Sequence, residues 1–266
     1  MRFIVSCLVL TIMASANAGD KPPSATLRIV GDNWCPYNCA ADSQLPGYLV
    51  EVIRRVLGSQ YRIDYRVVPW TRAVEMVSRS EADLLLATTP ETTPGLRLTE
   101  PVGIDRSCLF VRADSTWRFR QPADLDRITL GVIQDYKYDA DGPIDRLIAR
   151  RIATRDRRIE VATGEDALGS NFRKLRAGRM DALIENENVG AWTINQLGRR
   201  EALVNAGCVS GQPGTIHIAL APAHQGGTTL LGAIDNGIVE LRKRGELAAI
   251  LARYGIADWR PLLKRK

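Results

Sequence analysis

The sequence predicts an α/β protein of two similar lobes, each a mostly parallel sheet flanked by helices. Three observations predict this fold. Strand and helix patterns alternate along the chain, the same series occurs twice, and a strand that could cross to the other lobe follows each series. The 266 residues suffice for one large domain or two smaller ones. With 45% hydrophobic and 25% charged residues, the composition is that of a soluble globular protein and excludes a disordered chain.

Residues 1–18 have the pattern of a secretory signal peptide. Arg2 precedes an apolar run over Phe3–Met13, and small residues follow up to Ala16-Asn17-Ala18. A buried first helix is the alternative, but the Gly and Pro residues that come next disfavour it. No later apolar stretch approaches the ~20 residues of a membrane span. We therefore expect an exported, periplasmic chain that begins near Gly19, whose net charge falls from +6 to +5 when Arg2 is removed.

Export changes the interpretation of the cysteines, of which four remain after cleavage of the signal peptide. An even number of cysteines in an oxidising compartment favours disulfides, and four cysteines allow three pairings. Cys35 and Cys39 lie close together in a Pro-containing loop, and Cys108 and Cys208 lie near strands expected to run side by side. We predict the pairs Cys35–Cys39 and Cys108–Cys208. A zinc site is the alternative, but neither histidine has a metal-ligand spacing, so we expect no bound metal.

The first series of elements covers the N-terminal part of the mature chain. Leu27–Val30 is predicted as a strand, and the apolar spacing of Tyr48–Leu57 predicts a helix. Tyr61–Val68 alternates and is rich in β-formers, which predicts a strand. Thr71–Ser80 has a helical apolar face, and Leu84–Ala87 is predicted as a buried strand.

The second series repeats the first roughly 100 residues later. The corresponding segments are Thr129-Leu130 with Thr26-Leu27, Gly142–Ile152 with Gly47–Leu57, Ile159 with Ile63, and Leu175–Asp181 with Val77–Asp83. Chance similarity between ordinary α/β segments is the alternative. The repeat favours two lobes of the same βαβαβ plan.

Two strands are expected to connect the lobes as a hinge. Ser107–Arg112 follows the first series and would lead into the second lobe, whereas Thr215–Leu220 would lead out of it. The C-terminal part, helical over Leu230–Leu251, would then return to the first lobe. Two lobes on a hinge enclose a cleft, and small ligands bind in such clefts. The expected boundaries are 24–111 and 216–266 for the first lobe and 112–215 for the second.

Several motifs occur in an order and spacing that carry a family resemblance over nearly all of the mature chain. They are Leu27–Val30 with Pro36-Tyr37, Leu45–Tyr48, Val68–Ala73, Ala82-Asp83, Thr99–Pro101, Asp124-Leu125, Leu130–Ile133, Gly178–Ala182, and Gly245–Gly255 with Asp258-Trp259. The chain resembles the extracytoplasmic solute-binding proteins of family 3, the polar amino acid uptake type. The resemblance implies a type II periplasmic binding protein-like fold. It also implies a receptor that closes on a small polar solute, an amino acid or related metabolite, and hands it to an ABC transporter permease in the inner membrane. We expect a monomer without a cofactor.

Candidate ligand-binding residues follow the C-terminal ends of the predicted strands, where α/β sheets present their ligands. In the first lobe they are Trp34, Tyr37, Trp70, Arg72, Thr88 and Thr89. In the second lobe they are Gln134, Tyr136, Tyr138, Glu185 and Asn186. Aromatic walls supply apolar contact and hold cations, and Arg clamps a carboxylate or phosphate. Packing residues and an ordinary polar rim are the alternatives. We expect Trp70→Ala or Arg72→Ala to weaken ligand binding.

Two positions depart from the family pattern for amino-acid ligands. The family's carboxylate-binding Arg is expected about seven residues before Thr99, where Thr92 stands; Arg97 nearby, or Arg72, could take that role. The family's ammonium-binding Asp corresponds to Asn186. The ligand therefore stays open between an α-amino acid and another small polar or anionic metabolite.

Three other functions compete with solute capture. Cyclohexadienyl dehydratase resembles these binding proteins, and a similar enzyme would need a proton donor such as Glu185 or Glu187. The sequence contains no hydrolase elbow, phosphate loop or metalloprotease motif. We therefore expect that the chain is not an enzyme. A sensing role would require docking to a separate membrane receptor. Six Arg within 146–158 could suggest nucleic-acid binding, but export and interspersed acidic residues predict a solvated helix face instead.

Overall fold

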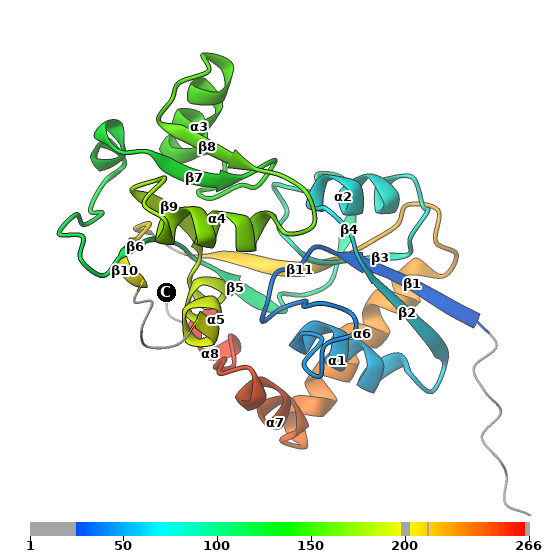
Figure 1. Cartoon of the computed structure of the whole chain (residues 1–266). Coiled ribbons are helices and arrows are strands. Elements are labelled where there is room, and N and C mark those ends of the chain that lie inside the picture. The colour runs from blue at the N-terminus through cyan, green and yellow to red at the C-terminus, as the bar shows by residue number, and fades with distance from the viewer. Residues whose placement is uncertain (1–24, 198–202, 212, 264–266) are drawn as a thin grey trace, which may run out of the picture.

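The structure is a computed structural model, and it describes residues 25–197, 203–211 and 213–263. The predicted signal peptide, residues 1–18, lies outside the described residues. Figure 1 shows two lobes, each built from a sheet with helices packed on it, with β11 running between them. No helix among the described residues has the length and apolar character needed to cross a membrane.

The first lobe is built on a six-stranded sheet, and its secondary structure comes from both ends of the chain. Its strands are β1 (Ala25–Gly31), β2 (Tyr61–Val67), β3 (Leu84–Thr88), β4 (Arg97–Leu98), β5 (Gly103–Asp105) and β11 (Gly214–Leu220). Its helices are α1 (Tyr48–Leu57), α2 (Trp70–Ser78), α6 (Gly227–Lys243), α7 (Glu246–Arg253) and α8 (Arg260–Leu263). The strand order is β2-β1-β3-β11-β4, with β5 paired to β11.

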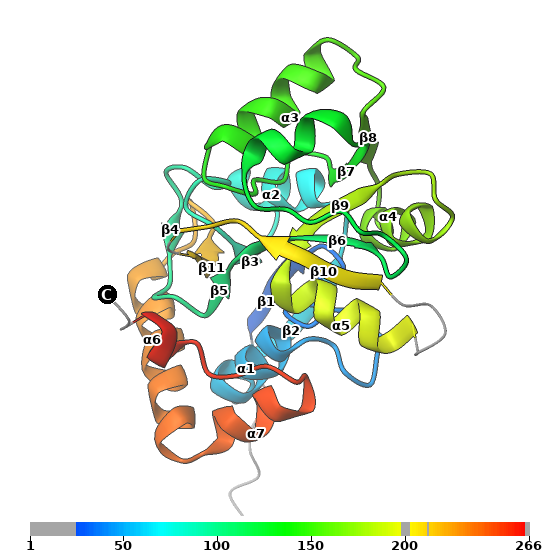
Figure 2. The same ribbon diagram turned by 90° about the vertical axis from the view of Figure 1, so that its left-hand side faces the viewer.

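The second lobe is built on a five-stranded sheet of order β10-β6-β9-β7-β8. Its strands are β6 (Ser107–Arg112), β7 (Leu130–Ile133), β8 (Ile159–Ala162), β9 (Ala182–Asn186) and β10 (Leu203–Cys208). Its helices are α3 (Pro143–Ala153), α4 (Ala167–Arg176), α5 (Glu187–Leu197) and the short 3-10 helix η1 (Pro122–Arg127). Figure 2 shows α5 on the side of this sheet that faces the first lobe.

The predicted internal repeat is confirmed by the pairing of the strands. In the first lobe β1 is parallel to β2 and β3, and in the second lobe β7 is parallel to β8 and β9. The turn after the second helix of each series is also the same, because Ser80 and Gly178 both have a positive φ and both donate to a carbonyl three residues back. Asp83 then accepts from the backbone N–H of Arg28 in β1, and Asp181 accepts from that of Thr129, directly before β7.

The register of the repeat differs on the two sides of β1 and β7. Leu27 lies beside Ile63 and Leu130 lies beside Ile159, which agrees with the alignment that the sequence suggested. On the other side Ile29 lies beside Leu84, whereas Leu130 lies beside Ala182, so the third strands are displaced by two residues relative to that alignment. A displacement of two residues keeps every strand side chain on the same face, so the hydrophobic pattern cannot detect it.

The lobes are connected where β5 passes into β6 and where β10 passes into β11. The first crossing lies at Arg106, and the second lies in the short segment before Gly214. β11 pairs antiparallel with β5 and with β3, and Gly214 lies beside Asp105, so the two connections run next to each other. The sequence placed the boundaries slightly later, at 111/112 and 215/216.

Both predicted disulfides are present in the structure. Cys108 of β6 lies opposite Cys208 of β10 in an antiparallel pair, and their Cα atoms are 3.8 Å apart. The sequence did not predict β10, so the partner strand that positions Cys208 differs from the one expected. Cys35 and Cys39 are joined within the loop after β1.

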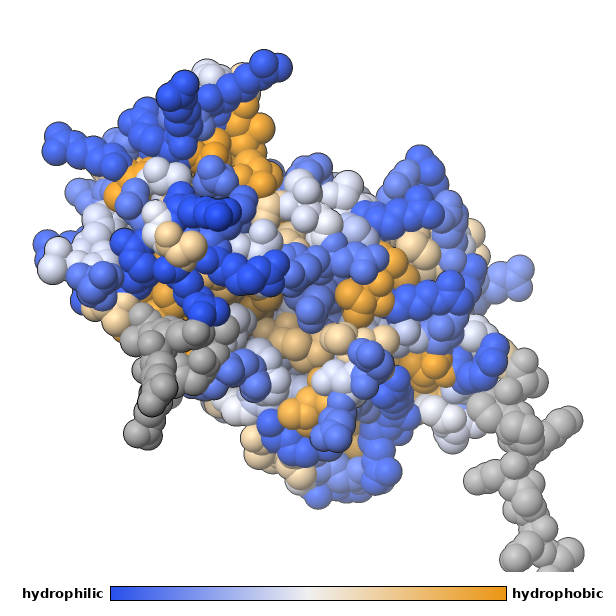
Figure 3. Space-filling view, in the orientation of Figure 1, coloured by the Kyte–Doolittle hydropathy of each residue, from blue (hydrophilic) through white to orange (hydrophobic). Residues whose placement is uncertain are grey.

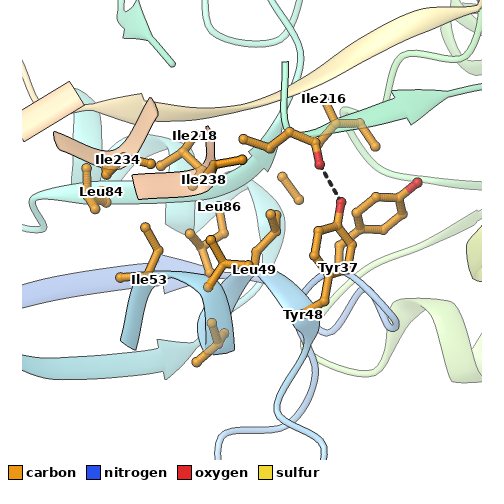
Figure 4. Close-up of a cluster of buried hydrophobic side chains, with 14 of the residues drawn as sticks. Tyr37, Tyr48, Leu49, Ile53, Leu84, Leu86, Ile216, Ile218, Ile234 and Ile238 are labelled. Atoms are coloured by element: carbon orange, nitrogen blue, oxygen red, sulfur yellow. Dashed lines mark hydrogen bonds between the residues drawn. The ribbon is translucent and has the colours of Figure 1, made fainter. Parts of the chain in front are cut away.

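The largest hydrophobic core lies in the first lobe between the sheet and helices α1, α6 and α7. Figure 4 shows its centre, where side chains from both ends of the chain meet. Those labelled there are Tyr37, Tyr48, Leu49, Ile53, Leu84, Leu86, Ile216, Ile218, Ile234 and Ile238. This packing ties the C-terminal helices to the first lobe, and it supports the loops that form one side of the cleft.

The Arg-rich helix α3 differs in one respect from the solvated face that was expected. Arg151 is only 3% exposed, and its guanidinium donates to the carbonyl oxygens of Leu125 and Arg158. Burial of this side chain lowers the pKa of Arg151. The remaining surface on this side of the molecule is mostly hydrophilic, as Figure 3 shows, with small separate hydrophobic areas.

Candidate ligand-binding site

A cavity that opens to solvent lies between the two lobes, with about 420 Å³ of space not filled by protein atoms, part of it open solvent. Its lining from the first lobe consists of Asp32, Trp34, Trp70, Ala87, Thr89, Thr92 and Asp105. Its lining from the second lobe consists of Ser107, Tyr136, Lys137, Tyr138, Glu185 and Asn186. The cavity therefore needs both lobes, which is the arrangement that the repeat and the two crossing strands predicted.

The elements present these side chains because parallel strands end at a common edge of each sheet. Asp32 and Trp34 follow β1, and Thr89 follows β3. Tyr136 follows β7 in the second lobe, and Glu185 lies at the end of β9. The equivalent ends of two similar lobes thus face each other across the cavity.

Seven of the twelve predicted residues line the cavity. They are Trp34, Trp70, Thr89, Tyr136, Tyr138, Glu185 and Asn186. Two others lie behind its wall. The Tyr37 hydroxyl donates to the carbonyl oxygen of Ile104 at 3.0 Å. The Thr88 hydroxyl lies 2.9 Å from the Thr92 hydroxyl, and both Tyr37 and Thr88 are fully buried.

The remaining three predicted residues lie outside the cavity. Arg72 forms ion pairs with Glu75 and Glu81 on the surface of the first lobe. Helix α2 begins at Trp70, and a residue two positions later points about 200° round the helix, so Arg72 faces away when Trp70 faces inward. Arg97 lies on the edge strand β4, near the start of α6. Gln134 is exposed, and its side chain donates to that of Asp135.

Six lining residues were not among the predicted ones: Asp32, Ala87, Thr92, Asp105, Ser107 and Lys137. Asp32 could have been found, because it directly follows β1 and obeys the rule that selected Trp34. Lys137 lies inside the segment that supplied Tyr136 and Tyr138. The crossing segment supplies two of the others, and the sequence placed this crossing too late to reveal them.

The lobes touch each other directly across the cleft. Trp34 Nε1 donates to Glu185 Oε1 at 2.9 Å, and the Tyr136 hydroxyl donates to Asp32 Oδ2. At the rim, the hydroxyl of Thr71 lies 2.8 Å from a carboxylate oxygen of Asp135. The structure is thus a closed form in which side chains of one lobe complete the cavity of the other.

Aromatic rings form one wall of the cavity. The Tyr136 ring stands perpendicular to the Trp34 ring and nearly perpendicular to the Trp70 ring, with centroids 6.4 and 5.8 Å away. The ring of Trp34 also stacks on Tyr37 behind it, at 4.6 Å. Edge-to-face contacts of this kind hold the rings in fixed orientations.

Three carboxyl groups lie in this cavity, and burial raises the pKa of each. The pKa of Glu185 is raised to about 8, although its hydrogen bonds with Asn186 and Trp34 oppose the shift. Burial raises the pKa of Asp32 to about 6 against the hydrogen bond from Tyr136, and it raises the pKa of Asp105 to about 6. The site therefore holds buried acids whose ionised forms are poorly compensated.

One group of His, Cys, Asp and Glu side chains in the described ranges comes close enough together to hold a metal ion. It consists of Cys108, Cys208 and Glu187. Its two cysteines are joined to each other in a disulfide, so their sulfur atoms are not thiolate ligands.

The geometry agrees with comparisons to solved structures. A histidine kinase sensor domain similar to periplasmic binding proteins is 21% identical, with 88% of this chain and 96% of that chain covered and a TM-score of 0.68. A protein from a study of glutathione import via GshT and the cystine ABC importer TcyBC of Streptococcus mutans is 16% identical, with coverages of 86% and 94% and a TM-score of 0.70. An ancestral amino acid-binding protein, a precursor of cyclohexadienyl dehydratase, is 15% identical, with coverages of 86% and 94% and a TM-score of 0.65. At these identities the similarity shows the fold, which is the predicted two-lobed type II periplasmic binding protein-like fold.

Comparison of the sequence itself gives the family. A search of curated proteins finds no match. Residues 27–257 match the family model of the bacterial extracellular solute-binding proteins, family 3. Since the match spans most of the sequence, the chain belongs to the bacterial extracellular solute-binding proteins, family 3.

Proposed function

We propose that this chain captures a small polar solute between its lobes in the periplasm and delivers it to an ABC transporter permease in the inner membrane. The observation that carries the proposal is the closed cleft, in which Trp34 and Asp32 of one lobe bond directly to Glu185 and Tyr136 of the other. A ligand that contacts both lobes would favour the closed form, and a permease could distinguish that form from the open one. The chain would act as a monomer, and its role would be binding and not catalysis.

The comparisons support this proposal in general terms. One similar structure comes from a study of import through an ABC importer, and another is described as an amino acid-binding protein. The histidine kinase sensor domain uses the same fold for sensing. A ligand-sensing role would begin with the same capture step and would differ only in the membrane partner.

A thermal-shift screen of the exported chain tests solute capture. The screen covers amino acids, polyamines, organic acids and phosphonates, because a ligand that binds the folded state raises the Tm by mass action. At a free concentration 100 times its Kd, a ligand stabilises the fold by about 2.7 kcal/mol, so a hit is readily measured. Absence of a shift for every class would contradict the proposal.

Two variants on helix α2 locate the site once a solute is found. Trp70→Ala removes a ring from the cavity wall and should weaken binding about 10-fold or more, since burying an aromatic side chain against a ligand contributes about 1.5–3 kcal/mol. Arg72→Ala is the matched control, because Arg72 pairs with Glu75 and Glu81 away from the cavity. Equal weakening in both variants would place the site elsewhere.

A second candidate function is an enzyme similar to cyclohexadienyl dehydratase. The observation that favours it is Glu185, whose pKa is raised to about 8 by burial and which is therefore largely protonated at neutral pH. A buried carboxylic acid in a cleft is the form that a general acid takes. Incubation with prephenate or arogenate decides between the two, because a decarboxylated aromatic product would identify an enzyme.

A further inference from the structure

The charges on the cavity wall are unbalanced. Glu185 is 1% exposed and Asp32 is 8% exposed, and neither makes a salt bridge with any residue in the described part of the chain. Asp105 is half-buried beside them and has no such partner there either. The one cationic side chain among the lining residues is Lys137, and its Nζ lies 2.5 Å from a carboxylate oxygen of Asp141. The cavity therefore has an excess of acidic groups.

The carboxyl groups are held in place by neutral donors. Asn186 donates from its backbone N–H to Glu185 Oε1 at 2.7 Å and from its side chain to Asp105 Oδ1 at 3.0 Å. Trp34 Nε1 donates to the same oxygen of Glu185. The second oxygen, Glu185 Oε2, is buried and has no hydrogen-bond partner. A buried polar atom without a hydrogen-bond partner costs about 1–3 kcal/mol, and a cationic ligand that ionises Glu185 and donates to this oxygen would remove that cost.

Aromatic rings line the same cavity as these oxygens. Trp34 and Trp70 line the same cavity as Glu185, and Tyr136 stands between the two rings. The face of an indole ring attracts a cation, more strongly when the cation is removed from water. An acidic oxygen without a donor and a wall of aromatic rings are complementary to a positively charged organic group with an apolar part.

We propose that the cleft binds a small organic cation that carries no carboxylate, with its charged group at Glu185 and Asp105 and its apolar part against Trp34 and Trp70. This inference rests on the proposed function, since it names the class of solute that the same cleft captures. A carboxylate on the ligand would find no guanidinium among the lining residues and would lie near the carboxylates of Asp32 and Asp105. Like charges at close range cost several kcal/mol in a binding site, so amino acids and organic acids are disfavoured.

The protonation of the acids supports this inference. Burial raises the pKa of Glu185 to about 8 and the pKa of Asp32 to about 6, because no cation compensates their ionised forms. A bound cation would favour ionisation, so the cavity would release protons as the ligand enters. Calorimetry in two buffers of different ionisation enthalpy measures this release directly.

The test compares matched probes that differ either in a carboxylate or in a positive charge. Agmatine is compared with L-arginine and cadaverine with L-lysine, and choline is compared with its neutral analogue 3,3-dimethyl-1-butanol. We expect each amine without a carboxylate to bind about 100-fold more tightly than its amino acid. We also expect choline to bind more tightly than the neutral alcohol, because only choline carries a positive charge, which the aromatic rings and the acidic groups attract.

Variants of the acidic groups identify the contacts. Glu185→Gln and Asp105→Asn should each weaken the binding of the amines about 10-fold or more. Asp64→Asn is the control, because Asp64 pairs with Arg66 on the surface of β2. Circular dichroism and Tm establish whether each variant folds. If Glu185→Gln does not fold, Asp105→Asn alone tests the contacts.

The outcomes separate the inference from the proposed function. Tighter binding of an amino acid or an organic acid than of the matched amine would overturn the inference and leave solute capture intact. Equal amine affinity in the acid variants and in the wild-type chain would also overturn it. No binding by any member of this panel or of the wider screen would overturn both.

Discussion

Trp34, which follows the first strand of one lobe, donates its indole N–H to the carboxyl group of Glu185, which ends a strand of the other lobe. The two residues are 7% and 1% exposed, so this bond lies in the interior of the closed cleft. It joins the lobes at the place where a ligand would bind. The same contact therefore affects the hinge equilibrium and the shape of the cavity.

The variant Trp34→Phe tests the effect of this bond on closure. Phenylalanine keeps an aromatic ring but has no N–H, so the closed form should lose about 1 kcal/mol relative to the open form. We expect the ligand-free chain to populate open forms about fivefold more, which small-angle scattering would measure as a larger radius of gyration. Trp117→Phe is the control, because Trp117 packs near Phe119 in the second lobe. Identical scattering curves for Trp34→Phe and the wild-type chain would contradict the prediction.

The stability of the fold should decrease as the pH rises toward 8. Burial raises the pKa of Glu185 from 4.5 to about 8, so between these values the folded chain holds a proton that the unfolded chain has released. The free energy of unfolding should then fall by up to about 1.4 kcal/mol per pH unit over this interval. Asp32 and Asp105, with pKa values raised from 3.8 to about 6, contribute in the same direction below pH 6.

The variant Glu185→Gln isolates the contribution of this residue between pH 6 and 8. The groups that face Glu185 are the carboxyls of Asp32 and Asp105 and the hydroxyls of Tyr136 and Tyr138. Because the two aspartates titrate near pH 6, the slope above that value should be smaller in Glu185→Gln than in the wild-type chain. Glu165→Gln, at an exposed position of the second lobe, serves as the control. Urea unfolding at a series of pH values measures the slopes, and equal slopes in all three chains would reject the assignment.

The fold was largely predictable because a repeat and a hydrophobic period carry most of the information about it. Both series of strands and helices could be recognised, and their similarity indicated two lobes. The sequence did not predict β10, because Leu203–Cys208 becomes a strand by pairing with β6 and has little alternation of its own. Nor did the sequence reveal that the third strands of the two series are displaced by two residues against the first strands, since two registers two residues apart bury the same face.

The candidate site was less predictable because it depends on directions that only the folded chain defines. Trp70 and Arg72 both lie in the first turn of α2, two residues apart. Only the observed start of the helix shows that Trp70 faces the cavity and Arg72 faces solvent. Asp105 and Ser107 reach the cavity because the crossing lies between them. The acidic character of the site could have been noticed at Asp32, which is next to the first strand.

The Cys108–Cys208 disulfide should contribute more to stability than the Cys35–Cys39 disulfide. Its cysteines are separated by 100 residues in sequence, whereas those of the other pair are separated by 4. In the chain-entropy model a loop of about 100 residues gives ~4.7 kcal/mol of stabilisation, and a short loop gives less. We expect the double variant Cys108→Ser and Cys208→Ser to lose more unfolding free energy than Cys35→Ser and Cys39→Ser. An equal loss in the two double variants, measured by urea unfolding, would contradict this.

Helix α5 packs against both lobes, and at Gly190 it approaches the second lobe closely. A Cβ atom added at Gly190 would lie 2.0 Å from the ring of Phe110, which is 1% exposed and held within the core. The opposite side of the helix contacts the first lobe, where the Trp192 ring lies 5.8 Å from that of Tyr254. Gly190→Ala should therefore move α5 and destabilise the fold by about 1–3 kcal/mol, as overpacked core positions do.

Gly232 in helix α6 provides the matched control for this prediction. A Cβ atom added there meets nothing within 4 Å, so Gly232→Ala should stabilise the fold by up to about 1 kcal/mol through helix propensity. The two variants make the same chemical change in a helix, and only the approach of Phe110 separates them. Urea unfolding should therefore shift in opposite directions for the two chains. If Gly190→Ala were as stable as Gly232→Ala, α5 would not be packed against the second lobe as closely as the structure shows.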